Sequence, residues 1–310
     1  MKRSSKSIIS RIAPTPSGYL HFGNAFNFLL TALIVYSKGG HLHLRIDDMD
    51  GQRVQASSVE DIFLQLEWLG IEYDSGPIGP DDLFKNHSQR LRREKYLDTI
   101  ELFRNEGKLF ACECSRSEIR RFSKSNNYPG TCRQKNLDFI KRNRPWRFLV
   151  PEQSEVTFKT FANKYESINV AKEMGDFIIK RRDGLPGYQI ISVMEDIELG
   201  VNLVVRGDDL LNSTATQIFL AQSLNDSVFP AAKFLHHKLI NDKFSKKLSK
   251  SNGSLSLKKI RERYPSAVFI YRQVGKLLNL PYQQINTLED LKTIYSETIK
   301  RRDEFKSFIS

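Results

Sequence analysis

The first part of the chain alternates between short strand-like apolar runs and longer helix-like runs. Ile8–Ala13 is a short apolar run that ends at a proline turn, and His41–Asp47 alternates between apolar and polar positions as a strand does. Phe22–Lys38 has the apolar density and length of a helix, and Val59–Leu69 has the pattern of an amphipathic helix. This order predicts a parallel α/β sheet, with ligands at the carboxyl ends of its strands.

The pattern changes after Lys108, where a polar, cysteine-containing stretch follows. We expect this stretch to be an inserted subdomain stabilised by a local cross-link of its own, because strand and helix patterns resume after it. The later pattern predicts strands at 176–181 and 201–206, a helix or tight connection at 188–197 and a helix at 209–224. The domains expected are the first half of a Rossmann-like catalytic domain (1–108), the insertion (109–175), the second catalytic half (176–255) and a short helical tail (256–310).

Composition narrows the class of protein. Hydrophobic residues make up 40% and aromatic residues 11%, which excludes a disordered chain, and the formal net charge of +12 favours a polyanionic partner such as nucleic acid. No apolar run reaches the roughly 18 residues that a membrane helix needs, and no apolar segment typical of a signal peptide follows the basic N-terminus. Three cysteines do not suggest a disulfide framework, so a reducing cytoplasm is expected.

The turn between the first predicted strand and helix is the first candidate for chemistry. It reads Pro-Thr-Pro-Ser-Gly-Tyr-Leu-His-Phe-Gly-Asn over residues 14–24. Glycine backbone and the His21 imidazole at a helix N-terminus favour phosphate, and His21 could stabilise charge on a phosphate during transfer. Taken alone, the same residues also suit a purely structural turn.

A second candidate is Lys247-Leu248-Ser249-Lys250-Ser251, in a stretch rich in glycine and serine. Two lysines that flank small hydroxyl residues suit a loop that closes over a triphosphate. A solvated basic loop is the alternative for this pentapeptide alone.

The third candidate is a cysteine cluster. Cys112 and Cys114 are close enough to hold one cation, and Cys132, with Tyr128 between, could close a loop over it. Zinc is the usual ion for such a thiolate site. Small buried thiols without metal remain the alternative.

The first two segments together resemble the paired signature sequences of the class I aminoacyl-tRNA synthetases, whose consensus forms are His-Ile-Gly-His and Lys-Met-Ser-Lys-Ser. Flanking segments at residues 11–18, 44–50 and 205–211 narrow the resemblance to the glutamyl branch, and it covers roughly residues 8–255. The resemblance implies activation of glutamate as an adenylate, with ATP and Mg²⁺ as substrate.

The resemblance also implies roles for individual residues. The catalytic residues would be His21, Lys247 and Lys250. ATP would be bound by Pro14, His21, Gly23, Asn24, Asp208 and Lys250. Glutamate would be bound by Arg11, Thr15, Asp47, Tyr188 and Arg206. Asp47 stands where the family usually has a glutamate, so the carboxylate expected to hold the substrate ammonium is one methylene shorter.

The cysteine pattern resembles the zinc site of the glutamyl-Q tRNA(Asp) synthetases, truncated relatives of the glutamyl enzymes, in which a tyrosine completes the set. This implies a structural Zn²⁺ on Cys112, Cys114, Tyr128 and Cys132. Only residues 252–310 follow the second signature, and this short C-terminal segment also resembles that family. Its members, monomeric as a rule, transfer glutamate to queuosine in the anticodon stem-loop of tRNA(Asp). The alternatives are a compact glutamyl-tRNA synthetase that charges the tRNA 3′ end and a non-catalytic tRNA-binding paralogue.

Overall fold

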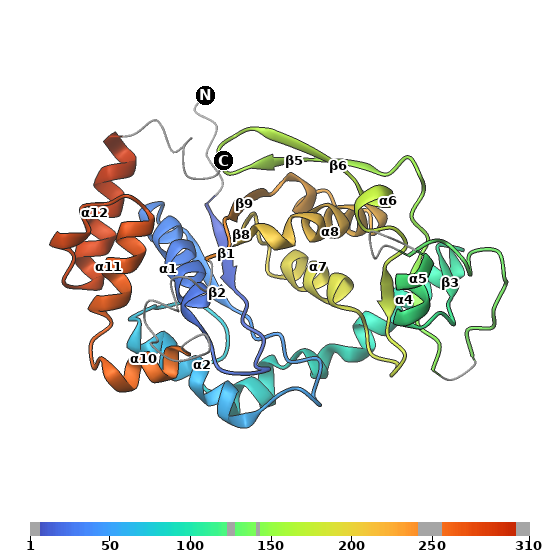
Figure 1. Cartoon of the computed structure of the whole chain (residues 1–310), viewed down its shortest axis with the longest axis horizontal. Coiled ribbons are helices and arrows are strands. Elements are labelled where there is room, and N and C mark those ends of the chain that lie inside the picture. Colours follow the sequence, from blue (N-terminus) through green and yellow to red (C-terminus); the bar gives the residue numbers. More distant parts are fainter. Residues whose placement is uncertain (1–6, 123–127, 141–142, 241–255, 302–310) are drawn as a thin grey trace. The chain divides into compact units, whose positions relative to one another are not determined.

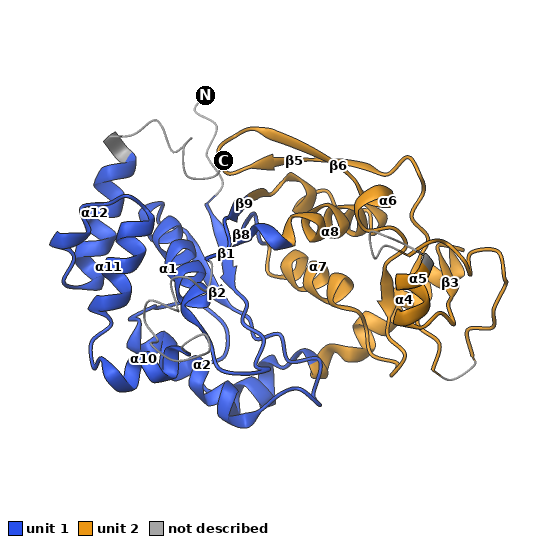
Figure 2. Ribbon diagram, viewed as in Figure 1, with its two compact units in different colours: residues 1–89, 201–209, 235–310 blue, residues 90–200, 210–234 orange. Residues whose placement is uncertain are grey.

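The computed structural model describes residues 7–122, 128–140, 143–240 and 256–301 (Figure 1). The chain forms two compact units, coloured separately in Figure 2. Unit 1 contains residues 1–89, 201–209 and 235–310, and unit 2 contains residues 90–200 and 210–234. The predicted insertion, 109–175, lies wholly within unit 2. Among the described residues, no helix is long and apolar enough to cross a membrane.

Unit 1 begins with the predicted strand–helix–strand–helix series. Its elements are β1 (Ile9–Ile12), α1 (Phe22–Ser37), β2 (His41–Leu44), α2 (Ala56–Trp68), the short α3 (Pro80–Asp82), β8 (Leu203–Gly207), α10 (Leu257–Arg263), α11 (Val268–Leu277) and α12 (Leu288–Arg301). Strands β1 and β2 pair in parallel, with Ile9 opposite His41 and Ile12 opposite Leu44, which confirms the predicted parallel arrangement.

Strand β8 extends this arrangement on the other side of β1. The Asn202 amide donates to the Ile9 carbonyl at 3.0 Å, and the Ser10 hydroxyl donates to the Leu203 carbonyl at 2.9 Å. Helices α11 and α12 pack on α1, as Figure 1 shows. The buried side chains of α1, such as Leu29 and Leu33, form the core between these layers.

Strand β2 is shorter than predicted, because the regular pairing ends at Leu44 and not at Asp47. Single hydrogen bonds nevertheless continue beyond the strand, since Arg45 N donates to Ile12 O at 2.9 Å and Asp47 N donates to Pro14 O at 2.9 Å. The backbone that follows β2 therefore stays fixed beside the backbone that follows β1.

Unit 2 combines antiparallel strands with helices. Its elements are α4 (Arg93–Asn105), β3 (Leu109–Ala111), α5 (Arg116–Phe122), β4 (Trp146–Phe148), β5 (Glu155–Thr160), β6 (Tyr165–Asn169), α6 (Val170–Glu173), β7 (Ile178–Lys180), α7 (Tyr188–Glu198) and α8 (Leu211–Ser223). Strand β9 (Lys233–His237) begins in unit 2 and ends in unit 1. Strands β3, β4 and β7 form one antiparallel sheet.

The hairpin β5–β6 is an element that we did not predict from the sequence. Its strands pair antiparallel from Glu155 opposite Asn169 to Lys159 opposite Tyr165, and β5 also runs parallel to the start of β9. Asn163, with φ of 61°, turns the chain between the two strands. An asparagine tolerates this left-handed conformation better than most residues do.

Candidate active site

The His21 turn is held by reciprocal hydrogen bonds at the start of α1. The Gly23 amide donates to His21 Nδ1 at 3.1 Å, and the His21 amide donates to Asn24 Oδ1 at 2.9 Å. A Cβ atom on residue 23 would lie 3.0 Å from the His21 ring, so a larger residue there would crowd the imidazole. The turn therefore fixes the orientation of the ring that we predicted to act on phosphate.

The residues that follow the second signature lie against this turn. The Leu257 amide donates to the Leu20 carbonyl at 2.7 Å, and Ser256 forms an isolated antiparallel bridge with His21. Lys258 Nζ lies 3.2 Å from the Tyr19 hydroxyl oxygen and 4.6 Å from the centre of that ring. The start of α10 thus lies beside the first signature. The predicted catalytic residues Lys247 and Lys250 lie outside the described residues.

Asp47, which we predicted to bind the substrate ammonium, is held by donors from its own chain. Arg45 Nε donates to Asp47 Oδ1 at 2.7 Å, and Gln89 Nε2 donates to the same oxygen at 2.8 Å. We did not predict a role for Arg45 or Gln89 from the sequence. Arg45 is two residues from Asp47 in the same predicted strand, so a side-chain contact between them could have been predicted. Gln89 is 42 residues from Asp47, and no sequence pattern connects the two.

The two arginines predicted to bind the glutamate carboxylates are buried on neighbouring strands. Arg11 on β1 is 5% exposed and Arg206 on β8 is 4% exposed. Arginine side chains are rarely this buried unless their charge is paired. The burial therefore argues against a role for either residue in a surface salt bridge. Burial, together with the nearby Arg206, lowers the pKa of His236 on β9 to about 3. The imidazole beside Arg206 is therefore neutral at pH 7.

The remaining predicted residues are distributed between the units. Pro14 is buried and accepts from Asp47, while Thr15 and Asp208 are exposed at the ends of β1 and β8. Tyr188 is the first residue of α7 in unit 2, is 45% exposed, and makes no hydrogen bond through its hydroxyl within the described ranges. The structure brings Arg11, Asp47 and Arg206 onto strands or strand ends of unit 1, whereas Tyr188 belongs to unit 2.

The three cysteines of unit 2 form the cluster that the sequence predicted. Their sulfur atoms all lie within 4.8 Å of one another, and Cys114 Sγ is 3.5 Å from Cys132 Sγ. Thiolates around one tetrahedral zinc, at Zn–S distances near 2.3 Å, would be about 3.8 Å apart. The spacing of the cluster therefore fits such an ion.

Tyr128 lies close enough to complete the cluster. Its hydroxyl oxygen is 3.9 Å from Cys114 Sγ and accepts from the Cys132 amide at 2.6 Å. The Arg147 guanidinium lies 3.8 Å from the centre of the Tyr128 ring, and Arg182 Nη2 donates to the Cys114 carbonyl at 2.6 Å. Burial raises the pKa of Tyr128 and raises that of Cys114 to about 11, so without a metal the Tyr128 hydroxyl and the Cys114 thiol hold their protons at neutral pH. A bound cation would have to displace these protons.

Comparison with known proteins places the chain in a family. Residues 7–277 match the family of the tRNA synthetases class I (E and Q), catalytic domain. This chain belongs to that family. A glutamate–tRNA ligase of Syntrophotalea carbinolica is 32% identical over 308 residues, which cover 92% of this chain and 60% of the relative. A glutamyl-Q tRNA(Asp) synthetase of Burkholderia cenocepacia is 35% identical over 258 residues, which cover 80% of this chain and 82% of the relative.

A solved class I synthetase has the same fold. The crystal structure of a glutamate tRNA ligase from Elizabethkingia meningosepticum, in complex with its amino acid, has a TM-score of 0.73. It is 22% identical to this synthetase domain, and the match covers 93% of this chain and 64% of that chain. The α/β class I synthetase fold with a parallel-sheet catalytic domain is therefore confirmed, while this chain spans only about 60% of the length of its glutamate–tRNA ligase relatives.

Proposed function

We propose that this protein activates glutamate with ATP and transfers it to queuosine in the anticodon stem-loop of tRNA(Asp). The observation that carries the proposal is the joint presence of two residue sets. Unit 1 holds the buried Arg11 and Arg206 and the partly buried Asp47, and unit 2 holds the cluster of Cys112, Cys114, Cys132 and Tyr128. The first set suits an acidic amino acid, and the second resembles the zinc site of the glutamyl-Q enzymes. Family membership and relatives of both names support the reaction class.

Recognition of glutamate would divide its charges between two kinds of side chain. The guanidinium groups of Arg11 and Arg206 would bind carboxylates, for which the planar fork of arginine is better shaped than lysine. Asp47 would take the ammonium, with Arg45 and Gln89 keeping its carboxylate in position. Thr15 and Tyr188 would add hydroxyl contacts.

Activation begins when the glutamate α-carboxylate attacks the α-phosphorus of ATP and pyrophosphate leaves. The protein would contribute positioning and electrostatic stabilisation, since negative charge builds on the phosphate oxygens and the leaving group. His21 and Lys250 would stabilise that charge, Lys247 would act on the pyrophosphate side, and Mg²⁺ would accompany ATP. Pro14, Gly23, Asn24 and Asp208 would complete the nucleotide site.

A second candidate function is charging of the tRNA 3′ end, which the relatives named glutamate–tRNA ligase favour. The two reactions share the adenylate and differ only in the acceptor hydroxyl. In both, the partner would be tRNA, and a Zn²⁺ on the cysteine cluster would be structural.

The deciding experiment locates labelled glutamate in the tRNA. Purified protein is incubated with ATP, Mg²⁺, labelled glutamate and total tRNA, either intact or with only the terminal adenosine removed. Queuosine transfer predicts equal labelling of both samples and no labelling of total tRNA from cells that lack queuosine. Periodate treatment is unsuitable, because it destroys the queuosine diol as well as the terminal ribose.

Each other result leads to a different conclusion about the acceptor. Label only in the intact tRNA would replace the queuosine proposal with 3′-end charging. No label in either sample, while pyrophosphate exchange proceeds, would indicate another acceptor. Neither transfer nor exchange would overturn the proposed activity altogether.

A further inference from the structure

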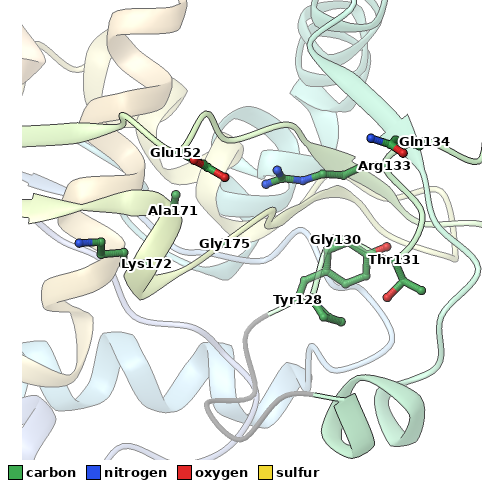
Figure 3. A pocket seen from close by; sticks show the side chains of 10 residues that line it. Tyr128, Gly130, Thr131, Arg133, Gln134, Glu152, Ala171, Lys172 and Gly175 are labelled. Atoms are coloured by element: carbon green, nitrogen blue, oxygen red, sulfur yellow. The ribbon is translucent and has the colours of Figure 1, made fainter.

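The loop that carries Tyr128 and Cys132 also forms one wall of a pocket of about 600 Å³ in unit 2. In Figure 3 the guanidinium of Arg133 points toward Glu152, with Tyr128 and Thr131 on one side and Ala171 on the other. Gly175, with φ of 60°, lies opposite the backbone of Tyr128, and a Cβ atom there would come 3.4 Å from the Tyr128 carbonyl oxygen. The pocket is of a size that takes a small organic group.

Arg133 is fixed in this pocket by a buried carboxylate. Its Nε and Nη2 atoms donate to the two oxygens of Asp176 at 2.5 and 2.7 Å, and Nη2 also donates to the Val150 carbonyl at 3.1 Å. The Asp176 side chain is 0% exposed, whereas that of Arg133 is 35% exposed. This pairing raises the pKa of Arg133, so the group stays charged. Within the described ranges Nη1 makes no hydrogen bond, so Arg133 presents one preorganised donor edge.

Three further polar side chains line the pocket and have no side-chain hydrogen bond within the described ranges. They are the Thr131 hydroxyl, the Gln134 amide and the Glu152 carboxylate. Together with Arg133 they offer three donor groups (Arg133, Thr131 and Gln134) and three acceptor groups (Thr131, Gln134 and Glu152). Side chains that bond to each other would not be available to a ligand. Because these side chains do not, they can form hydrogen bonds to a bound group.

The charges of the pocket decide which chemical group fits it. The lining contains the positive Arg133 and Lys172 and the negative Glu152, and the buried Asp176 behind it compensates Arg133, so these four charges sum to zero. A phosphate dianion would gain little from such a lining and would be repelled by Glu152. Arginine, amide and carboxylate side chains read the edges of nucleobases, and the Tyr128 ring and Pro129 add apolar surface.

We propose that this pocket binds one unstacked nucleotide of the substrate tRNA through its base and ribose. The inference rests on the proposed function only in taking tRNA as the partner. The net charge of +12 would supply the sequence-independent attraction, and the pocket would add contacts to one base. Arg133 and Glu152 would then be specificity-determining residues for the tRNA.

The test compares two pocket variants with matched controls elsewhere in unit 2. Glu152→Gln is paired with Glu166→Gln on β6, and Gln134→Ala is paired with Gln222→Ala on α8, because both control side chains are exposed and lie outside the pocket. Binding of total tRNA is measured by filter retention over a series of salt concentrations. Each pocket variant should bind roughly five- to tenfold more weakly than its control. The slope of log K against log salt should not change, because no phosphate contact is lost.

Two results would overturn the proposal. Equal binding by pocket variants and controls would mean that the pocket takes no part in tRNA recognition. Tighter binding by Glu152→Gln would mean that a phosphate, repelled by Glu152, occupies the site. These outcomes are distinct from failure of the proposed function, since the position of labelled glutamate is read on unaltered protein and does not depend on the pocket variants.

Discussion

The glutamate-binding candidates of unit 1 and the cysteine cluster of unit 2 are held in place by different means. Arg11 and Arg206 lie within paired strands, and the backbone of Asp47 continues the hydrogen bonding of β2. The cysteine cluster lies mainly on connecting segments, where side chains such as Arg182 support the backbone. Strand pairing fixes the backbone of the unit 1 candidates, and Arg45 and Gln89 position the Asp47 carboxylate. A cluster of thiols on loops depends more on what joins the thiols together.

The largest expected effect of this difference is on metal binding. Cys132→Ser should lower the affinity for zinc roughly 10³-fold, because a site of four donors loses one of them. Zinc competition with a chromogenic chelator measures the change. Pyrophosphate exchange should fall much less than zinc affinity, since the proposed activation residues are in unit 1.

The unaltered protein and Cys114→Ser serve as controls for this measurement. Unaltered protein is refolded in excess zinc, and its bound zinc is measured. A content well below one equivalent would contradict the metal site. A Cys132→Ser protein that keeps its zinc while Cys114→Ser loses it would show that a different set of donors binds the ion.

The next effect concerns the glutamate site. Arg206→Leu should raise the KM for glutamate in pyrophosphate exchange roughly 100-fold, because a charged hydrogen-bonding partner of a carboxylate is removed. Arg120→Leu, an exposed position on α5, is the matched control. An unchanged KM in Arg206→Leu, with intact folding by circular dichroism, would remove Arg206 from the substrate pocket.

The same two regions show which features the sequence could predict. The strand before Asp47 and the strand that carries Arg206 were predictable from their apolar patterns, whereas the roles of these two residues follow only from the family resemblance and stay predictions. Gln89 and the Arg133–Asp176 pair were not predictable, because these contacts cross about forty residues of chain and leave no periodic signal. The hairpin β5–β6 was missed because its alternating pattern lies among polar residues within the insertion.

A smaller effect is expected for stability against pH, and it arises in unit 1. Burial lowers the pKa of His236 to about 3 in the folded protein, against about 6.5 in the unfolded chain. Between these values the unfolded chain binds more protons, so the free energy of unfolding should fall as the pH drops from 6.5 towards 3. One such group contributes at most about 1.4 kcal/mol per pH unit.

Urea unfolding of His236→Gln and the unaltered protein at several pH values measures this contribution. The variant should lose less stability than the unaltered protein on acidification, because glutamine takes up no proton. Equal slopes in the two proteins would show that His236 keeps an ordinary pKa when folded. His87→Gln, a half-buried histidine of unit 1 with an acidic neighbour, is the control substitution.

The smallest expected effect concerns the contact between the first signature and the start of α10. Lys258 lies beside Tyr19 at the protein surface, whereas Leu257 and Ser256 approach Leu20 and His21 through the backbone. Lys258→Met should therefore slow pyrophosphate exchange only about two- to fivefold, since the backbone contacts remain and exposed ion pairs and cation–ring contacts are weak. Lys95→Met, which removes an exposed ion pair with Glu198 in unit 2, should leave exchange unchanged.

Recovery of the exchange rate by Lys258→Arg would distinguish positioning of the His21 turn from a general loss of stability, because arginine keeps both the charge and the contact with the ring. A loss of a hundredfold or more in Lys258→Met would mean that Lys258 touches the reacting phosphates. In that case the charge that stabilises the transition state would extend beyond the two signature sequences into α10, and the backbone contacts would not be sufficient to hold the turn.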